Sequence, residues 1–200
     1  MKNSRVQKLV GVAVLAAMAL VLQYLAFPIL PAFSFLKIDF SDIPVLLSMF
    51  LFGPLAGVST AFIRSFLHLL TTGIADPANM VGDVASFLAS IVFALPIYMF
   101  FKDAVKKSNR YLGLFVGICS LTIFMSVANY FVITPLYLHF YSLSANQMLG
   151  MALSKYIAIG IIPFNIIKGA LVSIVFVVLY AKLLPWLSRK TVQKTSVNIH

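Results

Sequence analysis

Four stretches of the sequence contain no Asp, Glu, Lys or Arg, and they constrain the fold more than any other feature. They cover residues 9–36, 43–63, 84–101 and 111–154. A helix needs about 17 to 25 apolar residues to cross a bilayer, so each stretch can hold a spanning helix. The chain is 62% hydrophobic and 10% charged, whereas a soluble domain is about one quarter charged. These features exclude a water-soluble globular protein, a nucleic-acid-binding protein and a disordered chain.

The uncharged stretches predict an all-α integral membrane protein with six transmembrane helices in a single membrane domain, residues 1–200. The predicted spans cover residues 9–27, 43–53, 55–72, 80–101, 111–134 and 157–184. The second span is short, and Gly53-Pro54 joins it to the third by a tight turn. These two could also form one hairpin or a bent re-entrant pair. The segment of residues 135–156, which includes the end of the longest uncharged stretch, is expected to be a polar loop.

The basic residues fall mainly on one side of this predicted topology. The sequence has 15 Lys and Arg, five Asp and no Glu, which gives a net charge of +10. Eleven of the 15 precede the first span, separate the fourth from the fifth, or end the chain. Lys37 and Lys155 lie on the opposite side, and Arg64 and Lys168 lie inside spans. The positive-inside rule therefore predicts a cell-membrane protein with both termini in the cytoplasm.

Lys168 lies about eleven residues into the last predicted span, where a charge costs about 2.5–3.5 kcal/mol on insertion scales. It therefore needs a partner. Asn165 is three residues earlier and shares its helix face, and Pro163 predicts a kink just before both residues. The pair could belong to a structural network with neighbouring helices, but its chemistry favours ligand binding.

Other polar residues in the predicted spans have structural interpretations beside functional ones. Asn129, in the fifth span, could hydrogen-bond a neighbouring helix. It could also complete a pocket together with Asn165 and Lys168. Arg64 and His68 share a face of the third span, and we expect Arg64 to form a structural ion pair with Asp42 or Asp83. Asp83 is expected to cap the fourth span.

The sequence lacks the motifs of several classes of protein. It contains no GxxxxGK[ST] phosphate-binding loop, and its single Cys119 excludes an internal disulfide. Its three histidines have no metal-ligand spacing, and no nucleophile-and-base arrangement is visible. We therefore expect no enzyme activity and no metal site.

Two further features concern the surface of the predicted bundle. Ala13 and Ala17 are four residues apart in the first span and form a small-residue face on which another membrane helix could dock. The predicted inner loops are short or basic, which places any pocket on the outer half, beside the predicted outer loops at residues 28–42, 73–79 and 135–156. The aromatic residues of the first and third of these loops could be interfacial anchors or a lid over a ligand.

Four segments carry a resemblance to a known family. They are the basic N-terminus with the Ala13/Ala17 face, FLKIDFSDIPVLLSMFLFGPLAG at 35–57, NYF at 129–131 and KYIAIGIIPFNIIKGALVS at 155–173. With them the chain resembles, over essentially its whole length, the riboflavin-specific S components of energy-coupling-factor (ECF) vitamin transporters.

The resemblance implies a bacterial plasma-membrane protein that captures riboflavin with high affinity and has no cofactor. A separate transmembrane coupling protein and two ATPases would supply the energy, and Ala13 and Ala17 would meet the coupling protein. The alternative is a structural membrane subunit or a channel without vitamin specificity.

The resemblance also implies a ligand site. Asn129, Asn165 and Lys168 would hydrogen-bond the flavin ring, whose pyrimidine edge alternates acceptors with a donor that amides and an ammonium can match. Leu36, Asp39 and Phe40 of the first loop would close over the ligand.

Overall fold

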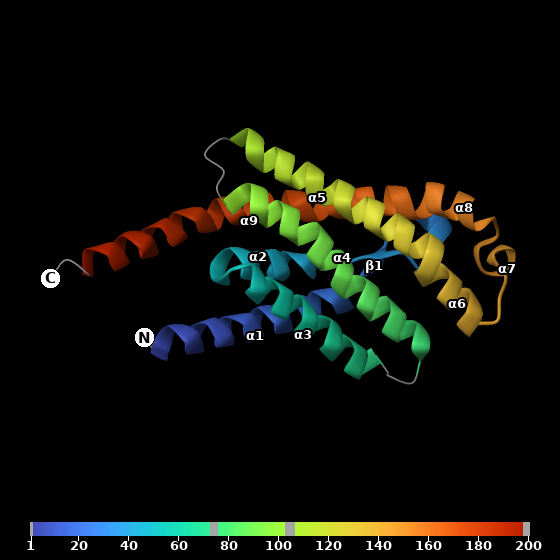
Figure 1. Cartoon of the computed structure of the whole chain (residues 1–200), viewed down its shortest axis with the longest axis horizontal. Coiled ribbons are helices and arrows are strands. Elements are labelled where there is room, and N and C mark those ends of the chain that lie inside the picture. Colours follow the sequence, from blue (N-terminus) through green and yellow to red (C-terminus); the bar gives the residue numbers. More distant parts are fainter. Residues whose placement is uncertain (1, 73–75, 103–106, 198–200) are drawn as a thin grey trace.

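The computed structural model describes residues 2–72, 76–102 and 107–197, and almost all of them are helical. Figure 1 shows an elongated helical bundle. The helices are α1 (Lys2–Tyr24), α2 (Asp42–Phe52), α3 (Pro54–Thr72), α4 (Pro77–Lys102), α5 (Lys107–Ala128), α6 (Thr134–Phe140), α7 (Ala145–Leu149), α8 (Leu153–Tyr156) and α9 (Ile162–Val197). Two π-helices, η2 (Asn129–Ile133) and η3 (Ile157–Ile161), join α5 to α6 and α8 to α9.

The architecture confirms the prediction of an all-α chain. Among the described residues, four helical segments are long and apolar enough to cross a membrane: Arg5–Tyr24, Pro77–Phe101, Asn109–Phe140 and Ala145–Lys182. The shorter α2 meets α3 at Gly53, whose φ of 97° makes the tight turn. The count of six spans and the side of the termini stay predictions.

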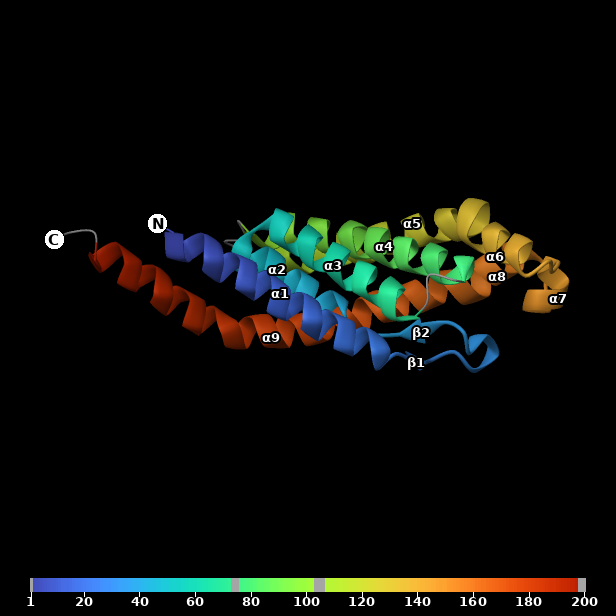
Figure 2. The ribbon, with the colours of Figure 1, turned by 90° about the horizontal axis from the view of Figure 1, so that it is seen from below.

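The segment between α1 and α2 is a small folded unit. Strands β1 (Phe27–Pro28) and β2 (Lys37–Ile38) pair antiparallel, with Phe27 opposite Ile38. The 3-10 helix η1 (Pro31–Phe33) forms the turn between them. In Figure 2 this hairpin lies beside the bundle, toward the end that carries α7.

The expectation of a polar loop over residues 135–156 is wrong for much of that segment. The fifth helix continues through the π-helix η2 into α6, and Pro135 lies in the first turn of α6, directly after η2. Ser144 and Gln147 then form a capping box that starts α7. The irregularity expected at Pro163 is the π-helix η3, which directly precedes α9.

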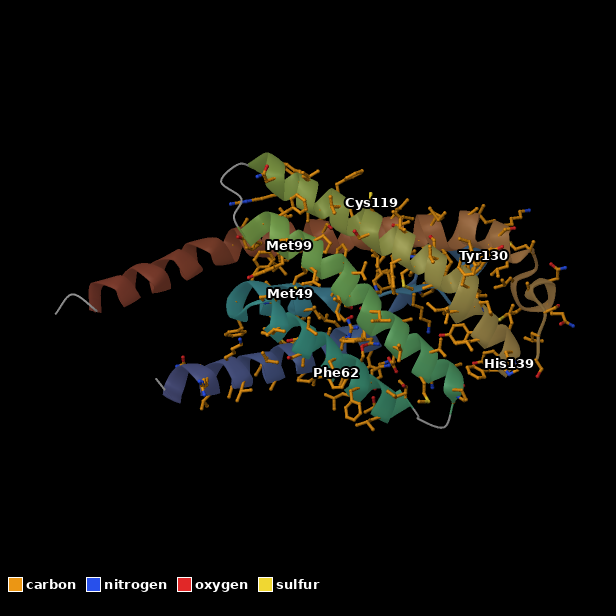
Figure 3. All side chains as sticks on the ribbon, in the orientation of Figure 1. Met49, Phe62, Met99, Cys119, Tyr130 and His139 are labelled. Carbon is orange, nitrogen blue, oxygen red and sulfur yellow. The ribbon has the colours of Figure 1, made fainter. Side chains whose placement is uncertain are left out.

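Helix α2 is enclosed by its neighbours and forms the centre of the bundle. Val45, Leu46 and Met49 are fully buried and pack in one cluster with Phe93 of α4 and Phe176 of α9. Figure 3 labels Met49 at α2, and Tyr130 and His139 toward the opposite end of the molecule. The end with Tyr130 and His139 holds the candidate site.

Gly57 on α3 sets the distance between α3 and α2. A Cβ atom at this position would lie 2.0 Å from Met49 Cγ and 3.0 Å from the Val45 carbonyl oxygen. We expect Gly57→Ala to lower the free energy of unfolding by about 1–3 kcal/mol, the usual cost of overpacking. Thermal unfolding in detergent tests this, with Ser59→Val on the exposed face of the same helix as the control. Equal melting temperatures for both variants would contradict the close approach.

Candidate functional site

A cavity of about 430 Å³ lies between the hairpin segment and helices α4, α5, α6 and α9. This volume falls within the range of about 300–1,000 Å³ that is typical of small-molecule sites. Its polar wall includes Asp39, Ser86, Asn129, Asn165 and Lys168. Of the six residues predicted to contact a ligand, the cavity brings together five: Leu36, Asp39, Asn129, Asn165 and Lys168.

Both asparagines are positioned by the π-helices. Asn129 is the first residue of η2, and Asn165 lies one turn after η3. Each Nδ2 donates to the carbonyl four residues earlier, Met125 O for Asn129 and Ile161 O for Asn165, both at 2.8 Å. Thr134 also donates to Asn129 Oδ1 at 3.2 Å. Because an amide nitrogen carries two N–H groups, each side chain keeps a second donor for a ligand.

Lys168 has protein partners as well as a place on the cavity wall. Its Nζ lies 3.2 Å from Asp39 Oδ2 and 3.6 Å from Asp42 Oδ2. The network interpretation of Lys168 is therefore confirmed. It does not replace the ligand interpretation, because Lys168 and Asp39 both line the cavity.

Asp39 stays ionised at this site. Burial by itself raises the pKa of the Asp39 carboxyl. The Lys168 ammonium, hydrogen bonds from Ser41 and the Arg64 charge outweigh burial and hold the pKa below its usual value. The cavity therefore presents a carboxylate next to an ammonium at neutral pH.

Phe40 lies apart from the other predicted lid residues. Its ring centroid is 6.4 Å from that of Phe27 on β1, and the side chain packs against the cluster around α2. It is not among the described residues that line the cavity. Successive side chains of an extended segment point to opposite sides, so Asp39 and Phe40 separate where the chain leaves β2.

Several aromatic residues on the cavity wall were not singled out from the sequence. Phe35, Tyr137, Tyr141 and Tyr156 line it, and Tyr156 packs against Phe33 with ring centroids 5.4 Å apart. The signal was the run of aromatic residues in the predicted outer loops. The spacing of these aromatic residues in the sequence does not distinguish side chains that anchor the protein at the membrane interface from side chains that line a cavity.

Arg64 and Asp83 each lie close to a titratable side chain of another helix. Arg64 lies 3.4 Å from Asp42, which confirms one of its two expected partners. Asp83 does not cap α4, because it lies well inside that helix and is buried. Its Oδ1 lies instead 2.7 Å from Nδ1 of His68 on α3, within hydrogen-bond distance. A buried carboxylate between two helices finds its partner on the facing helix rather than at a helix end.

Ala13 and Ala17 lie on the outer face of α1. Both are exposed, whereas Ala16 and Ala19 are fully buried. The exposed face also carries large apolar residues, namely Val6, Leu9, Val10, Val14, Met18 and Val21. A small-residue patch therefore points away from the bundle, as the docking hypothesis requires.

The chain matches known proteins over most of its length. Residues 7–180 match the family described as "ECF transporter, substrate-specific component". The chain is 37% identical over 196 residues to the riboflavin transporter FmnP of Bacillus subtilis (strain 168), a match that covers 98% of this chain and all of that protein. It is 39% identical over 185 residues to the riboflavin transporter RibU of Staphylococcus aureus (strain TCH60), a match that covers 92% and 93%. A solved structure of the S component of a bacterial ECF transporter superposes with a TM-score of 0.75 at 37% identity, covering 94% of this chain and 99% of that one.

Proposed function

This chain belongs to the substrate-specific components of ECF transporters, and we propose that it captures riboflavin for uptake. As a member of this family it is a multi-pass protein of the bacterial plasma membrane and a transporter component rather than an enzyme. The observation that carries the proposal is the cavity of about 430 Å³, whose wall combines Asn129, Asn165 and Lys168 with aromatic side chains. Two relatives that resemble the chain over at least 92% of its length are named riboflavin transporters.

The cavity wall suits the two parts of a flavin. The pyrimidine edge of the ring alternates carbonyl acceptors with an N–H donor, which matches the amide groups of Asn129 and Asn165. Lys168 adds a charge-assisted donor. The apolar faces of the ring suit Phe35 and Tyr156. In this proposal Leu36 and Asp39 close the first loop over the ligand, and Phe40 contributes by packing that loop on the bundle.

The proposed topology has six spans, a short second span and both termini in the cytoplasm. Figure 1 supports it, because α1 begins and α9 ends at the same end of the bundle. The cavity and α7 lie toward the other end, which would face the outside. The positive-inside charge pattern assigns the same orientation.

The proposed partners are a transmembrane coupling protein and two ATPase subunits. The chain has no phosphate-binding loop of its own, so ATP would be hydrolysed elsewhere. The exposed Ala13 and Ala17 are the proposed contact with the coupling protein, since small residues let helices approach closely.

Titration of the purified protein with riboflavin, followed by quenching of flavin fluorescence, tests the proposal. Saturable binding of one riboflavin per chain is the expected result. Parallel titrations with flavin mononucleotide and flavin adenine dinucleotide would show whether the site also binds flavins that carry a phosphate. The absence of saturable riboflavin binding would favour a structural subunit or a channel.

Asn165→Leu is expected to weaken riboflavin binding by roughly ten-fold. The variant loses an amide that contributes one or two hydrogen bonds, each worth about 0.5–1.5 kcal/mol. Asn146→Leu is the matched control, because Asn146 is exposed on α7 and does not line the cavity. Equal affinities for the two variants would remove Asn165 from the site.

A further inference from the structure

A closed ring of hydrogen bonds and ion pairs links four charged residues and Ser41. Lys168 Nζ lies 3.2 Å from Asp39 Oδ2 and 3.6 Å from Asp42 Oδ2. On the opposite side of the ring, Arg64 Nη1 donates to Ser41 Oγ at 2.8 Å and lies 3.4 Å from Asp42 Oδ1. The backbone N–H of Ser41 donates to Asp39 Oδ1 at 2.8 Å, and the Ser41 hydroxyl donates to the same atom. Each member is therefore linked to the next.

The ring has an inner side and a ligand side. Arg64 is 0% exposed and Asp42 is 3% exposed, and neither lines the cavity. Asp39 and Lys168 both line it. With both acids ionised the ring contains two positive and two negative charges, so its formal net charge is zero.

Arg64 bonds two members of the ring and also joins the ring to α4. From α3 it reaches Ser41 before α2, Asp42 at the start of α2 and, at 2.9 Å, Ser86 of α4. Its second nitrogen also donates to Ser65 at 3.1 Å. The planar guanidinium can bond several acceptors at fixed angles, which a lysine at this position could not do.

We propose that Arg64 and Asp42 are positioning residues for ligand binding. They do not touch the ligand. They hold Asp39 through Ser41, and Asp39 and Asp42 together hold the Lys168 ammonium at the cavity wall. The neutral ring leaves Lys168 free to exchange one carboxylate bond for a bond to the ligand without leaving an unpaired charge inside the protein. This inference rests on the proposed riboflavin function.

Arg64→Met tests the inference because it changes the ring charge from zero to minus one. The two carboxylates then hold Lys168 more strongly and the first loop loses its anchor, so riboflavin affinity should fall by about ten-fold. The affinity should also become pH-dependent and rise toward mildly acidic pH, as a proton neutralises the excess carboxylate. The wild-type profile, measured alongside, includes any contribution from the neighbouring His68–Asp83 pair.

The double variant Arg64→Met with Asp42→Asn restores a net charge of zero. We expect it to remove the added pH dependence and to recover part of the lost affinity. Ser65→Ala is the matched control, since it removes a hydrogen bond to Arg64 without changing charge. It should bind riboflavin with an affinity and a pH profile close to those of the wild type.

A wild-type pH profile for Arg64→Met, or equal pH dependence in the single and double variants, would overturn the inference. If Arg64→Met does not fold, Arg64→Lys replaces it, because lysine keeps the positive charge but lacks the planar guanidinium that bonds several acceptors. Weaker riboflavin binding by Arg64→Lys, with no added pH dependence, would then support the positioning role of Arg64. Wild-type affinity in this variant would overturn that role. Failure of the wild-type protein to bind riboflavin would instead overturn the proposed function, and this inference with it.

Discussion

Replacing Lys168 with leucine is expected to weaken riboflavin binding by about ten- to hundred-fold. A hydrogen bond from a charged donor contributes about 1.5–3 kcal/mol, and each 1.4 kcal/mol corresponds to about ten-fold in affinity. Lys168 lines the cavity and supplies an ammonium to its wall. Flavin fluorescence quenching with the purified variant measures the loss. Lys155→Leu is the control, because Lys155 is exposed on α8 and is not among the residues lining the cavity.

The same substitution also leaves Asp39 and Asp42 without the ammonium that pairs with both. Breaking a buried ion pair from one side is strongly destabilising, so the variant should melt at a lower temperature. Adding Asp39→Asn restores the charge balance and should recover stability. It should not recover riboflavin binding, because the ammonium donor is still missing. Wild-type affinity in Lys168→Leu would exclude a ligand contact, and recovery of binding in the double variant would assign the defect to charge balance alone.

The double substitution Ala13→Trp and Ala17→Trp is expected to abolish riboflavin uptake and leave riboflavin binding unchanged. Both alanines point away from the bundle, so the introduced indole rings need not disturb the cavity. Two such rings would prevent the close helix approach that small residues allow. Uptake is measured in cells that produce the complete transporter, and binding is measured with the purified variant.

A matched pair of substitutions elsewhere on the surface controls for bulk in the membrane. Ile123 and Val127 of α5 are also four residues apart and are 65% and 53% exposed. Their replacement by tryptophan should leave both uptake and binding intact. Normal uptake in the double variant of Ala13 and Ala17 would contradict the docking face, and loss of riboflavin binding in it would show that α1 acts on the cavity.

Most of the helical architecture could be predicted from the distribution of charge. Gaps of 18 or more uncharged residues mark α1, α2, α4 and α5, because a charge inside a bilayer is costly wherever it has no partner. The exception was the segment after Ile133, where the expected loop is largely helical. Proline and polar residues normally indicate a loop, but here Pro135 lies in the first turn of α6 and Ser144 caps α7.

The candidate site could be predicted in part, because some of its residues are close in sequence. Asn165 and Lys168 are three apart, so helix geometry places them on one face. Asp39 is 129 residues from Lys168, and no local pattern indicates a pair at that separation. The sequence predicted an ion pair for Arg64 and a ligand contact for Lys168. Only the packing of α2 between α3 and α9 shows that both cations share one partner, Asp42.

The π-helices could not be predicted either. Asn129 and Asn165 both depend on them for their position near the cavity. A π-helix differs from an α-helix by a single inserted residue in one turn and is frequent at functional sites. Neither NYFVI nor IAIGI has a composition that sets it apart from the apolar helices around it.

The most direct test of the proposed ligand site is a structure of the protein determined with riboflavin. We expect one flavin in the cavity of about 430 Å³. Its pyrimidine edge should lie within hydrogen-bond distance of Asn129, Asn165 and Lys168, with Asp39 still bonded to Ser41. A flavin bound outside this cavity, or inside it without contact to these three side chains, would contradict the account.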